Sequence, residues 1–257
     1  MCIMISKNLI KNLRRLEQKK HRQSSGLFVG EGPKVVGELL SAFQSETFYC
    51  TSEWAANHHD VDVETVVVSD EELQRLSFLQ HPQQVLGVFH LPVEEESLEH
   101  SISQVTSSLC LGLDGVRDPG NVGTIIRIAD WFGIDTVFCS TDNADAFSPK
   151  VVQATMGSLA RVRVIPTDLF ALVTHLPPCT PVYGTLLDGD NLYTSELFNH
   201  GLLLMGNESL GLSPSLRKCL THRLFIPPHP PGRATAESLN VAVATAICCA
   251  EFRRRIL

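Results

Sequence analysis

The segment 114–129 combines a turn with residue types that can stabilise negative charge. Pro119 and Gly120 favour a turn, and Asn121 can cap the helix that follows it. Arg127 then lies about one and a half turns into that helix. Its guanidinium is a planar set of donors suited to an oxygen on which charge develops. The plainer interpretation is that Asn121 is only a cap and Arg127 only a surface residue.

A second loop follows the apolar stretch 202–205 and begins with Gly206. A glycine at this point lets a ligand approach the backbone closely. Glu208 then projects from a tight loop rather than from the face of a helix. Taken alone, this loop also fits a plain turn that contains two glycines.

A third loop begins with Ile226 and Pro227 and continues with several prolines. Ser238, or a residue just before it, is expected to cap the closing helix, which leaves backbone N–H groups free to meet a polar ligand. We expect Asn240 to be buried beside the apolar stripe of that helix, so its side chain needs hydrogen-bond partners. Asn240 is therefore either a structural residue or a functional one.

The elements that hold these loops alternate between apolar strands and helical patterns from about residue 109 onward. We expect strands at 109–113, 136–139, 162–165, 182–187, 202–205 and 224–226, and helices at 121–132, 151–160 and 238–255. Alternation of this kind predicts a mainly parallel sheet that helices cover on both faces. Ligands of such sheets bind in loops at the carboxyl ends of the strands, where all three loops lie.

The part of the chain before residue 109 is predicted to form a separate, smaller unit. Leucines at helical spacing indicate an amphipathic helix over 6–20, and short strands and helices follow up to about residue 92. Residues 96–108 follow an acidic run and are rich in Ser and Thr, a composition typical of a linker. The predicted organisation is therefore a domain at 1–95, a linker at 96–108 and a domain at 109–257.

The distribution of charge favours a nucleic-acid partner more than its sum does. The formal net charge is −7, but residues 1–40 hold eight Lys or Arg against three acids. Affinity for phosphates depends on local clusters. We call seven of these residues the basic cluster, a candidate RNA-binding surface: Lys7, Lys11, Arg14, Arg15, Lys19, Lys20 and Arg22. The alternative is an ordinary solvated helix face.

Several classes of protein are disfavoured by the sequence. The best apolar run, 241–250, has about half the length of a membrane-spanning helix. Eight cysteines are scattered without a C-x-x-C pair, and no His cluster has metal-ligand spacing, so no metal is expected. A dinucleotide fingerprint, G-x-G-x-x-G, is absent as well. These features predict a cytoplasmic protein with free thiols and no membrane partner.

The order of the three loops resembles that of the three motifs of the SpoU family of RNA methyltransferases. The loops read N-x-G-x-x-x-R, then G-N-E-x-x-G after a strand, then I-P and later S-L-N-V before a helix, and the resemblance covers about 109–255. The stretch 27–40 looks like the family's N-terminal RNA-binding domain, which is similar to small ribosomal proteins. The resemblance implies an α/β fold, in which a small α/β RNA-binding domain precedes a parallel-sheet methyltransferase domain with a trefoil knot.

The resemblance also implies an activity and a set of site residues. Family members transfer a methyl group from S-adenosylmethionine to a ribose 2′-hydroxyl of rRNA or tRNA, without a metal, as homodimers whose active site is completed across the interface. The positions that match the family's cofactor contacts are Thr185, Leu186, Gly206, Ile226 and Leu239. Those that match its catalytic and RNA-positioning residues are Asn121, Arg127, Glu208, Ser238 and Asn240.

Two departures from the family pattern and two alternative functions stay open. Asp118 stands where the family often has Asn, and the loop 228–237 is longer than usual, so its contacts cannot be transferred. A non-catalytic RNA-binding protein with the same fold is one alternative, which the presence of Arg127, Glu208 and Asn240 disfavours. A base methyltransferase of the same superfamily is the other, and the N-x-G-x-x-x-R motif favours ribose chemistry over it.

Overall fold

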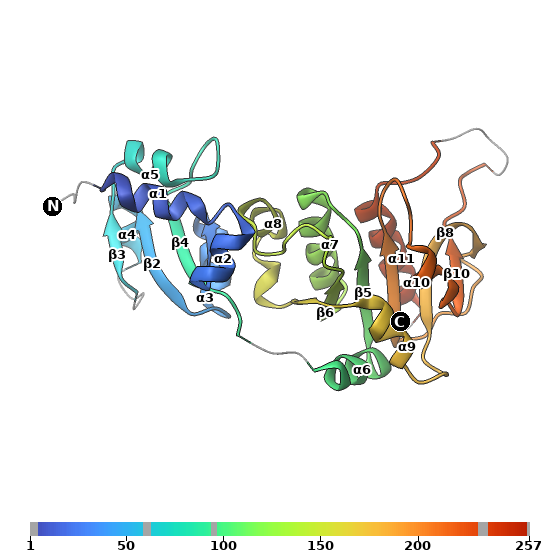
Figure 1. Cartoon of the computed structure of the whole chain (residues 1–257). Coiled ribbons are helices and arrows are strands. Elements are labelled where there is room, and N and C mark those ends of the chain that lie inside the picture. Colours follow the sequence, from blue (N-terminus) through green and yellow to red (C-terminus); the bar gives the residue numbers. More distant parts are fainter. Residues whose placement is uncertain (1–4, 59–62, 94–96, 231–235, 256–257) are drawn as a thin grey trace. The chain divides into compact units, whose positions relative to one another are not determined.

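A computed structural model describes the chain except residues 1–4, 59–62, 94–96, 231–235 and 256–257 (Figure 1). Contacts divide the chain into two compact units. Unit 1 contains residues 1–94 together with 145–160, and unit 2 contains residues 95–144 and 161–257. The segment 145–160 therefore belongs to unit 1, although it lies in sequence between two strands of unit 2.

Unit 1 is built on a four-stranded sheet in the order β1-β4-β2-β3. Only β2 and β3 run parallel to each other, whereas β4 is antiparallel to both of its neighbours. The strands are β1 (Leu27–Glu31), β2 (Ser45–Cys50), β3 (Thr65–Val67) and β4 (Val85–His90). The helices are α1 (Lys7–Arg15), α2 (Lys19–Ser25), α3 (Pro33–Leu40), α4 (Ser52–Asn57), α5 (Asp70–Leu76) and α8 (Pro149–Thr155), followed by the 3-10 turn Ser158–Ala160.

The segment 145–160 supplies part of the core of unit 1. The Phe147 ring lies 5.0 Å from Phe28 and 6.1 Å from Phe43 between ring centroids, and α8 packs against β1. Aromatic rings at these separations bury apolar area and add an edge-to-face attraction. The predicted helix over 151–160 is thus shorter than expected, and it contributes to unit 1.

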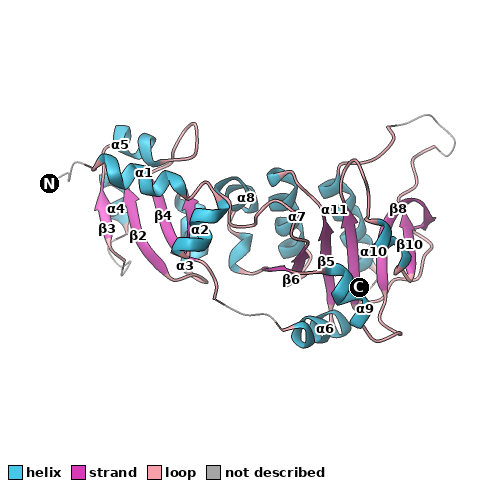
Figure 2. Ribbon diagram, in the orientation of Figure 1, coloured by secondary structure: helices cyan, strands magenta, loops and turns pink. Residues whose placement is uncertain are grey.

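Unit 2 holds a six-stranded sheet in the order β10-β8-β9-β5-β6-β7, and every strand pair in it is parallel. The predicted parallel sheet is therefore confirmed (Figure 2). Its strands are β5 (Leu109–Asp114), β6 (Thr136–Cys139), β7 (Arg163–Pro166), β8 (Val182–Asn191), β9 (Gly201–Gly206) and β10 (His222–Phe225). Its helices are α6 (Leu98–Ser107), α7 (Pro119–Trp131), α9 (Leu169–His175), α10 (Pro214–Lys218) and α11 (Val241–Arg254).

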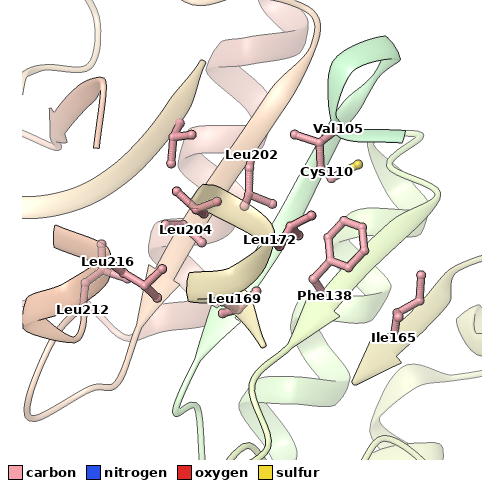
Figure 3. Close-up of a cluster of buried hydrophobic side chains, with 12 residues drawn as sticks. Val105, Cys110, Phe138, Ile165, Leu169, Leu172, Leu202, Leu204, Leu212 and Leu216 are labelled. Atoms are coloured by element: carbon pink, nitrogen blue, oxygen red, sulfur yellow. The ribbon is translucent and has the colours of Figure 1, made fainter. Parts of the chain in front are cut away.

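Helices cover both faces of this sheet because alternate strand residues point to opposite sides. Cys110, Leu202 and Leu204 face a cluster that α6, α9 and α10 complete with Val105, Leu172 and Leu216 (Figure 3). Helices α7 and α11 pack against each other over the other face. The central strands β5, β6 and β9 are buried from both sides, which explains their continuous apolar runs in the sequence.

Three predicted elements differ in the structure. The helix expected over 6–20 is two helices, α1 and α2, with a break after Arg15. The expected linker 96–108 contains helix α6, which buries Val105 against the sheet. Strand β8 extends to Asn191, and its pairing with β10 jumps from Gly184 to Asp190.

The buried face of α11 is not the stripe that the sequence suggested. Helical spacing from residue 238 onward predicts a buried stripe of Leu239, Val243, Ile247 and Ala250, but Leu239 and Val243 are 49% and 50% exposed. The buried residues are instead Val241, Ala242, Thr245, Cys248, Cys249, Glu251 and Phe252. This helix is apolar on nearly all sides, so periodicity alone did not select the face that packs.

Three expectations concern membrane-spanning helices, thiols and metal ligands. None of the described helices is long and apolar enough to span a membrane. The cysteines that the structure describes are all free thiols. Within the same part of the chain, no group of three or more His, Cys, Asp and Glu side chains is placed to hold a metal ion.

Candidate active site

The first and second loops leave the sheet side by side. Asp114 and Gly206, the last residues of β5 and β9, are register partners in neighbouring parallel strands. The loops that follow them therefore start from adjacent positions at the carboxyl edge of the sheet, as parallel pairing requires. Ser213 N, beyond the second loop, donates to Asp114 Oδ2 at 2.6 Å and ties the two loops together.

Asp118, and not Asn121, caps the helix of the first loop. The Asp118 side chain accepts from Asn121 N at 2.8 Å, and Pro119 occupies the first turn. The departure from the family pattern at Asp118 thus keeps a residue that caps well. The Asn121 side chain is released from capping and makes contacts with the other two loops.

Asn240 caps α11, in place of the predicted Ser238. Its Oδ1 accepts from Ala242 N at 3.0 Å and from Val243 N at 3.2 Å. The residue is exposed rather than buried, which corrects the expectation from its apolar neighbours. Ser238 and Leu239 precede the cap and are exposed as well.

A continuous chain of side-chain hydrogen bonds joins the three loops, and we call Asn240, Asn121 and Glu208 the amide chain. Asn240 Nδ2 donates to Asn121 Oδ1 at 2.9 Å, and Asn121 Nδ2 donates to Glu208 Oε1 at 2.7 Å. The helix N–H groups fix Asn240 Oδ1, so Nδ2 must face Asn121. Asn121 then has only one amide orientation that satisfies both neighbours, and its Nδ2 must face the carboxylate.

The second loop is folded by its own backbone and by Asn207. Asn207 N donates to Gly211 O at 3.1 Å, and Gly211 N donates back at 2.9 Å. Asn207 Oδ1 accepts from Ser209 N and Leu210 N, and Asn207 Nδ2 donates to Gly115 O at 2.7 Å. These bonds hold Glu208 at the tip of a rigid loop. Sequence reasoning missed Asn207, although a polar residue directly after a strand was a usable signal.

The loop after β6 holds the first loop from the opposite side. Asn143 Oδ1 accepts from Val116 N at 2.5 Å, and Asn143 Nδ2 donates to Leu113 O at 2.6 Å. Gly115 N donates to Ser140 Oγ at 2.9 Å. The hydrogen bond from Ser140 lowers the pKa of the neighbouring Asp142 carboxyl. No motif in the sequence indicated this support, because its residues follow a strand that carries no predicted site.

Arg127 is exposed on α7, six residues after Asn121. Within the residues that the structure describes, no hydrogen bond or ion pair restrains its guanidinium. All five of its N–H groups are therefore available to a ligand. The structure does not join Arg127 or Ser238 to the amide chain.

Four of the five positions matched to cofactor contacts lie in or directly after three neighbouring strands, β10, β8 and β9. Thr185 and Leu186 are half-buried in β8, Ile226 is half-buried directly after β10, and Gly206 ends β9. Leu239 lies just before α11 and is half-exposed. A Cβ at Gly206 would lie 2.3 Å from the carbonyl carbon of Gly211, so this glycine is required by the folding of its own loop.

The basic cluster of unit 1 divides into exposed and engaged residues. Lys7, Lys11, Arg15, Lys19 and Lys20 are exposed. The Arg14 guanidinium lies 5.1 Å from the centre of the Phe78 ring and donates to the Ser77 carbonyl.

Arg22 is only 2% exposed, so its assignment to the RNA-binding surface is wrong in this structure. It donates to the carbonyls of Leu16 and Glu17 at the break between α1 and α2, and to Asp145 Oδ2 at 2.6 Å. A buried guanidinium whose two terminal nitrogens already bond these oxygens holds the fold together and is not presented to RNA.

Comparison with known families adds two matches that cover most of the chain. The SpoU rRNA Methylase family matches residues 108–250. The MRM3-like substrate binding domain matches residues 7–87. The first match contains all three loops, and the second contains the basic cluster.

Comparison with individual proteins gives the same picture over the full length. The chain is 32% identical to the 23S rRNA (guanosine(2553)-2′-O)-methyltransferase of Bacillus subtilis, over 95% of each chain. Among solved structures, it is 43% identical to a protein assigned to the TrmH family of RNA methyltransferases from Porphyromonas gingivalis, with a TM-score of 0.85 over 98% of this chain and 100% of the other. An AdoMet-bound rRNA methyltransferase from Sinorhizobium meliloti is 29% identical, with a TM-score of 0.83 over 99% and 97%.

Proposed function

Because the chain belongs to the SpoU rRNA Methylase family, we propose that it transfers the methyl group of S-adenosylmethionine to a ribose 2′-hydroxyl of ribosomal RNA. The amide chain is the observation that carries this assignment to particular residues. It brings Asn121, Glu208 and Asn240 together from three loops that are far apart in sequence. A fold that kept only RNA binding would have no need to orient these three side chains at the sheet edge where ligands bind.

The residues at this edge fit S-adenosylmethionine. Leu187 in β8, Leu210 in the second loop and Leu239 before α11 expose 69%, 81% and 49% of their surface. Exposed apolar side chains in elements that border a binding site favour an aromatic base and a thioether-like chain. We assign cofactor contacts to Thr185, Leu186, Gly206, Ile226 and Leu239. When bound, the cofactor supplies an electrophilic methyl group.

Arg127 and Glu208 act on the RNA. Methyl transfer is an in-line displacement, so the ribose oxygen must be held close to the methyl carbon and aligned with it. A guanidinium holds its proton too tightly to be a good base, so Arg127 is a donor that steers the 2′-hydroxyl or its phosphate and stabilises developing charge. Glu208 keeps Oε2 for the ribose while Oε1 is held by Asn121, and Ser238 lies one loop away as a further positioning residue.

Unit 1 captures the RNA through its exposed basic residues. Lys7, Lys11, Arg15, Lys19 and Lys20 form this surface, with Arg14 at its edge and Arg22 inside the fold. The similarity of residues 7–87 to a substrate binding domain supports the assignment. The division into an RNA-binding domain at 1–95, a linker at 96–108 and a methyltransferase domain at 109–257 stays our functional proposal, with the segment 145–160 contributing to unit 1.

The trefoil knot, the homodimer and the cytoplasmic location are further parts of this proposal. Strands β8 and β10 pair in parallel with a register shift, and a Cβ on Gly189 would lie 2.7 Å from the Leu224 carbonyl carbon; we take this tight approach as support for a knot. The exposed apolar side chain of Val243, in the first turn of α11, supports a second copy of the chain as the partner. Ribosomal RNA as the substrate supports a cytoplasmic location, because the protein would act where ribosomes are made.

The proposal is tested by mass spectrometry of RNA nucleosides from cells that lack the protein. One 2′-O-methylated nucleoside of ribosomal RNA is expected to disappear, and purified protein with S-adenosylmethionine should restore it. Loss of a tRNA ribose methylation would correct the substrate, and loss of a base methylation would refute the ribose chemistry. Unchanged levels of methylated nucleosides in both ribosomal and transfer RNA would indicate a non-catalytic RNA-binding protein.

Cofactor binding is tested by calorimetry on a substitution that leaves the loop backbone intact. A Gly206→Val variant is unsuitable because its side chain would collide with Gly211 and Leu212. Leu239→Gln is expected to weaken binding of S-adenosylmethionine about tenfold, as a lost apolar contact of roughly 1.5 kcal/mol would. Phe170→Gln, which changes an exposed apolar residue on α9, is the control. Equal affinities of both variants would remove Leu239 from the site.

A further inference from the structure

Trp131, the last residue of α7, exposes 85% of its surface. A bare indole on the surface of a folded protein is unusual, because tryptophan has a large apolar area that burial would stabilise. The other tryptophan of the chain, Trp54, is 3% exposed and packs against Phe48. Trp131 therefore lacks the packing role that explains Trp54.

Trp131 lies on the same face of α7 as Arg127. Residues four apart on a helix are neighbours on its surface, about 6 Å apart along the axis. Thr124, Arg127 and Trp131 are exposed, whereas Ile125, Ile126 and other residues of the opposite face are buried. One solvent-facing stripe of α7 thus carries the candidate charge-stabilising arginine and, one turn further, the indole.

Two more guanidiniums are fixed on the chain neighbours of Trp131. Arg161 donates through Nε to Asp130 Oδ1 at 2.9 Å. Arg253 donates to the carbonyls of Phe132 and Gly133 at 2.6 and 2.7 Å. Together with Arg127 on the same helix, three arginines lie on α7 or are bonded to residues within two positions of Trp131.

An exposed aromatic ring among arginines suits an unpaired base of RNA. Every nucleobase has a flat face that stacks on an aromatic side chain, and the adjacent guanidiniums attract the phosphates on either side of it. Single-stranded segments are the parts of RNA whose bases are free to stack in this way.

We propose that the Trp131 indole is a stacking platform for an unpaired base of the substrate RNA, adjacent to the nucleotide whose ribose is presented to Arg127. This inference rests on the proposed function, because it takes RNA as the substrate. It makes Trp131 a positioning residue, which orders the RNA strand along α7 and leaves the methyl transfer itself to the loops at the sheet edge.

Fluorescence tests the proposal directly. In the full-length Trp54→Phe variant, Trp131 is the only tryptophan, so its emission reports the platform alone. A fluorescently labelled single-stranded oligoadenylate of about 12 nucleotides is the probe. We expect the RNA to quench the emission of Trp131 and to protect it from iodide, over the same concentration range in which the anisotropy of the labelled RNA rises.

Substitutions separate stacking from a general loss of structure. Trp131→Ala is expected to weaken oligoadenylate binding about five- to a hundredfold, whereas Trp131→Phe, which keeps a ring, retains most of the affinity. With ribosomal RNA as substrate, Trp131→Ala should raise the KM for RNA by a similar factor and leave kcat within about twofold, because stacking holds the strand in ground and transition states alike. Phe170→Ala, at an exposed ring of α9, is the control and should change neither.

Two results would overturn the platform. Oligoadenylate that binds with full anisotropy change while Trp131 emission stays unaltered would show that no base reaches the ring. Emission that shifts to the blue with protein concentration in the absence of RNA, together with dissociation of an oligomer in Trp131→Ala, would assign the indole to a second copy of the chain. Failure of the unsubstituted protein to bind either oligoadenylate or ribosomal RNA would refute the proposed function, and the platform with it.

Discussion

Asn240 has two roles, which two substitutions separate. Its Oδ1 caps α11 through Ala242 N and Val243 N, and its Nδ2 orients Asn121. Asn240→Ala removes both roles, and loss of an N-cap costs about 1 kcal/mol of the free energy of unfolding. Asn240→Asp keeps an oxygen at the cap and adds a negative charge at the helix start, which stabilises by about 0.3–1 kcal/mol. The aspartate variant should therefore keep the capping contribution that the alanine variant loses and be the more stable of the two.

The same aspartate disrupts the amide chain. Its second oxygen would face Asn121 Oδ1, where the natural protein has a donor at 2.9 Å. If the Asn121 amide rotates to relieve this oxygen–oxygen repulsion, Asn121 Oδ1 then faces Glu208 Oε1, and the repulsion lies between Asn121 and Glu208 instead. Glu208 thus loses a hydrogen bond to a charged group, worth about 1.5 kcal/mol at an exposed site. We expect a methylation rate about tenfold lower.

Urea denaturation and single-turnover methylation of ribosomal RNA, measured on the same samples, check this prediction. The expected result is a stable but slow Asn240→Asp variant and an Asn240→Ala variant that is both less stable and slow. Asn199→Asp adds the same charge to an exposed loop of unit 2 and serves as the control. A natural methylation rate in Asn240→Asp would refute the role of the amide chain in orienting Glu208.

Three further predictions follow from the structure. Arg127→Ala should lower the single-turnover methylation rate by about two to three orders of magnitude. Its affinity for S-adenosylmethionine, measured by calorimetry, should not change. An Arg127→Lys variant that methylates near the natural rate would show that a point charge suffices and would refute the steering role. Arg22→Ala should lower the free energy of unfolding in urea by about 3 kcal/mol, because it leaves the largely buried Asp145 carboxylate unpaired. Lys20→Ala should weaken RNA binding without this loss of stability. An Arg22→Ala variant that loses RNA binding but no stability, or a Lys20→Ala variant that loses stability but no RNA binding, would contradict these assignments. Hydrogen bonds from Arg254 and Arg255 hold the pKa of Glu251 at about 2, below its usual 4.5. The stabilisation that the ionised carboxylate gives is therefore complete above pH 4.5 and is lost as the pH falls from there toward 2. In Glu251→Gln the free energy of unfolding should depend less on pH in this range, and an unchanged slope would show that Glu251 does not cause the pH dependence.

The sheet and the activity were predictable from the sequence because each leaves a local signal. Continuous apolar runs such as 109–113 and 202–205 mark strands buried from both sides, and their order places the loops at one edge. The motif residues Asn121, Glu208 and Asn240 indicated a family whose activity and cofactor the relatives confirm. The roles assigned to individual side chains stay predictions.

The features that sequence reasoning missed depend on partners distant in the chain. Arg22 looks like any member of the basic cluster until Asp145, 123 residues away, is placed against it. Asp118 and Asn121, three positions apart, can each cap a helix; in the structure Asp118 is the cap, and the Asn121 side chain bonds Glu208. In both cases a local pattern offers several outcomes, and tertiary contacts select one.

The position of the segment 145–160 has a consequence for the order in which the protein folds during synthesis. When residue 94 leaves the ribosome, Phe28 still lacks Phe147, and Arg22 still lacks Asp145. The 66 residues between 94 and 160 take roughly 3 to 13 s to translate. Over that interval the first unit waits with an uncovered apolar face and an unpaired arginine. Its final packing therefore begins only after about a third of the methyltransferase portion has been made, although unit 1 starts at the first residue of the chain.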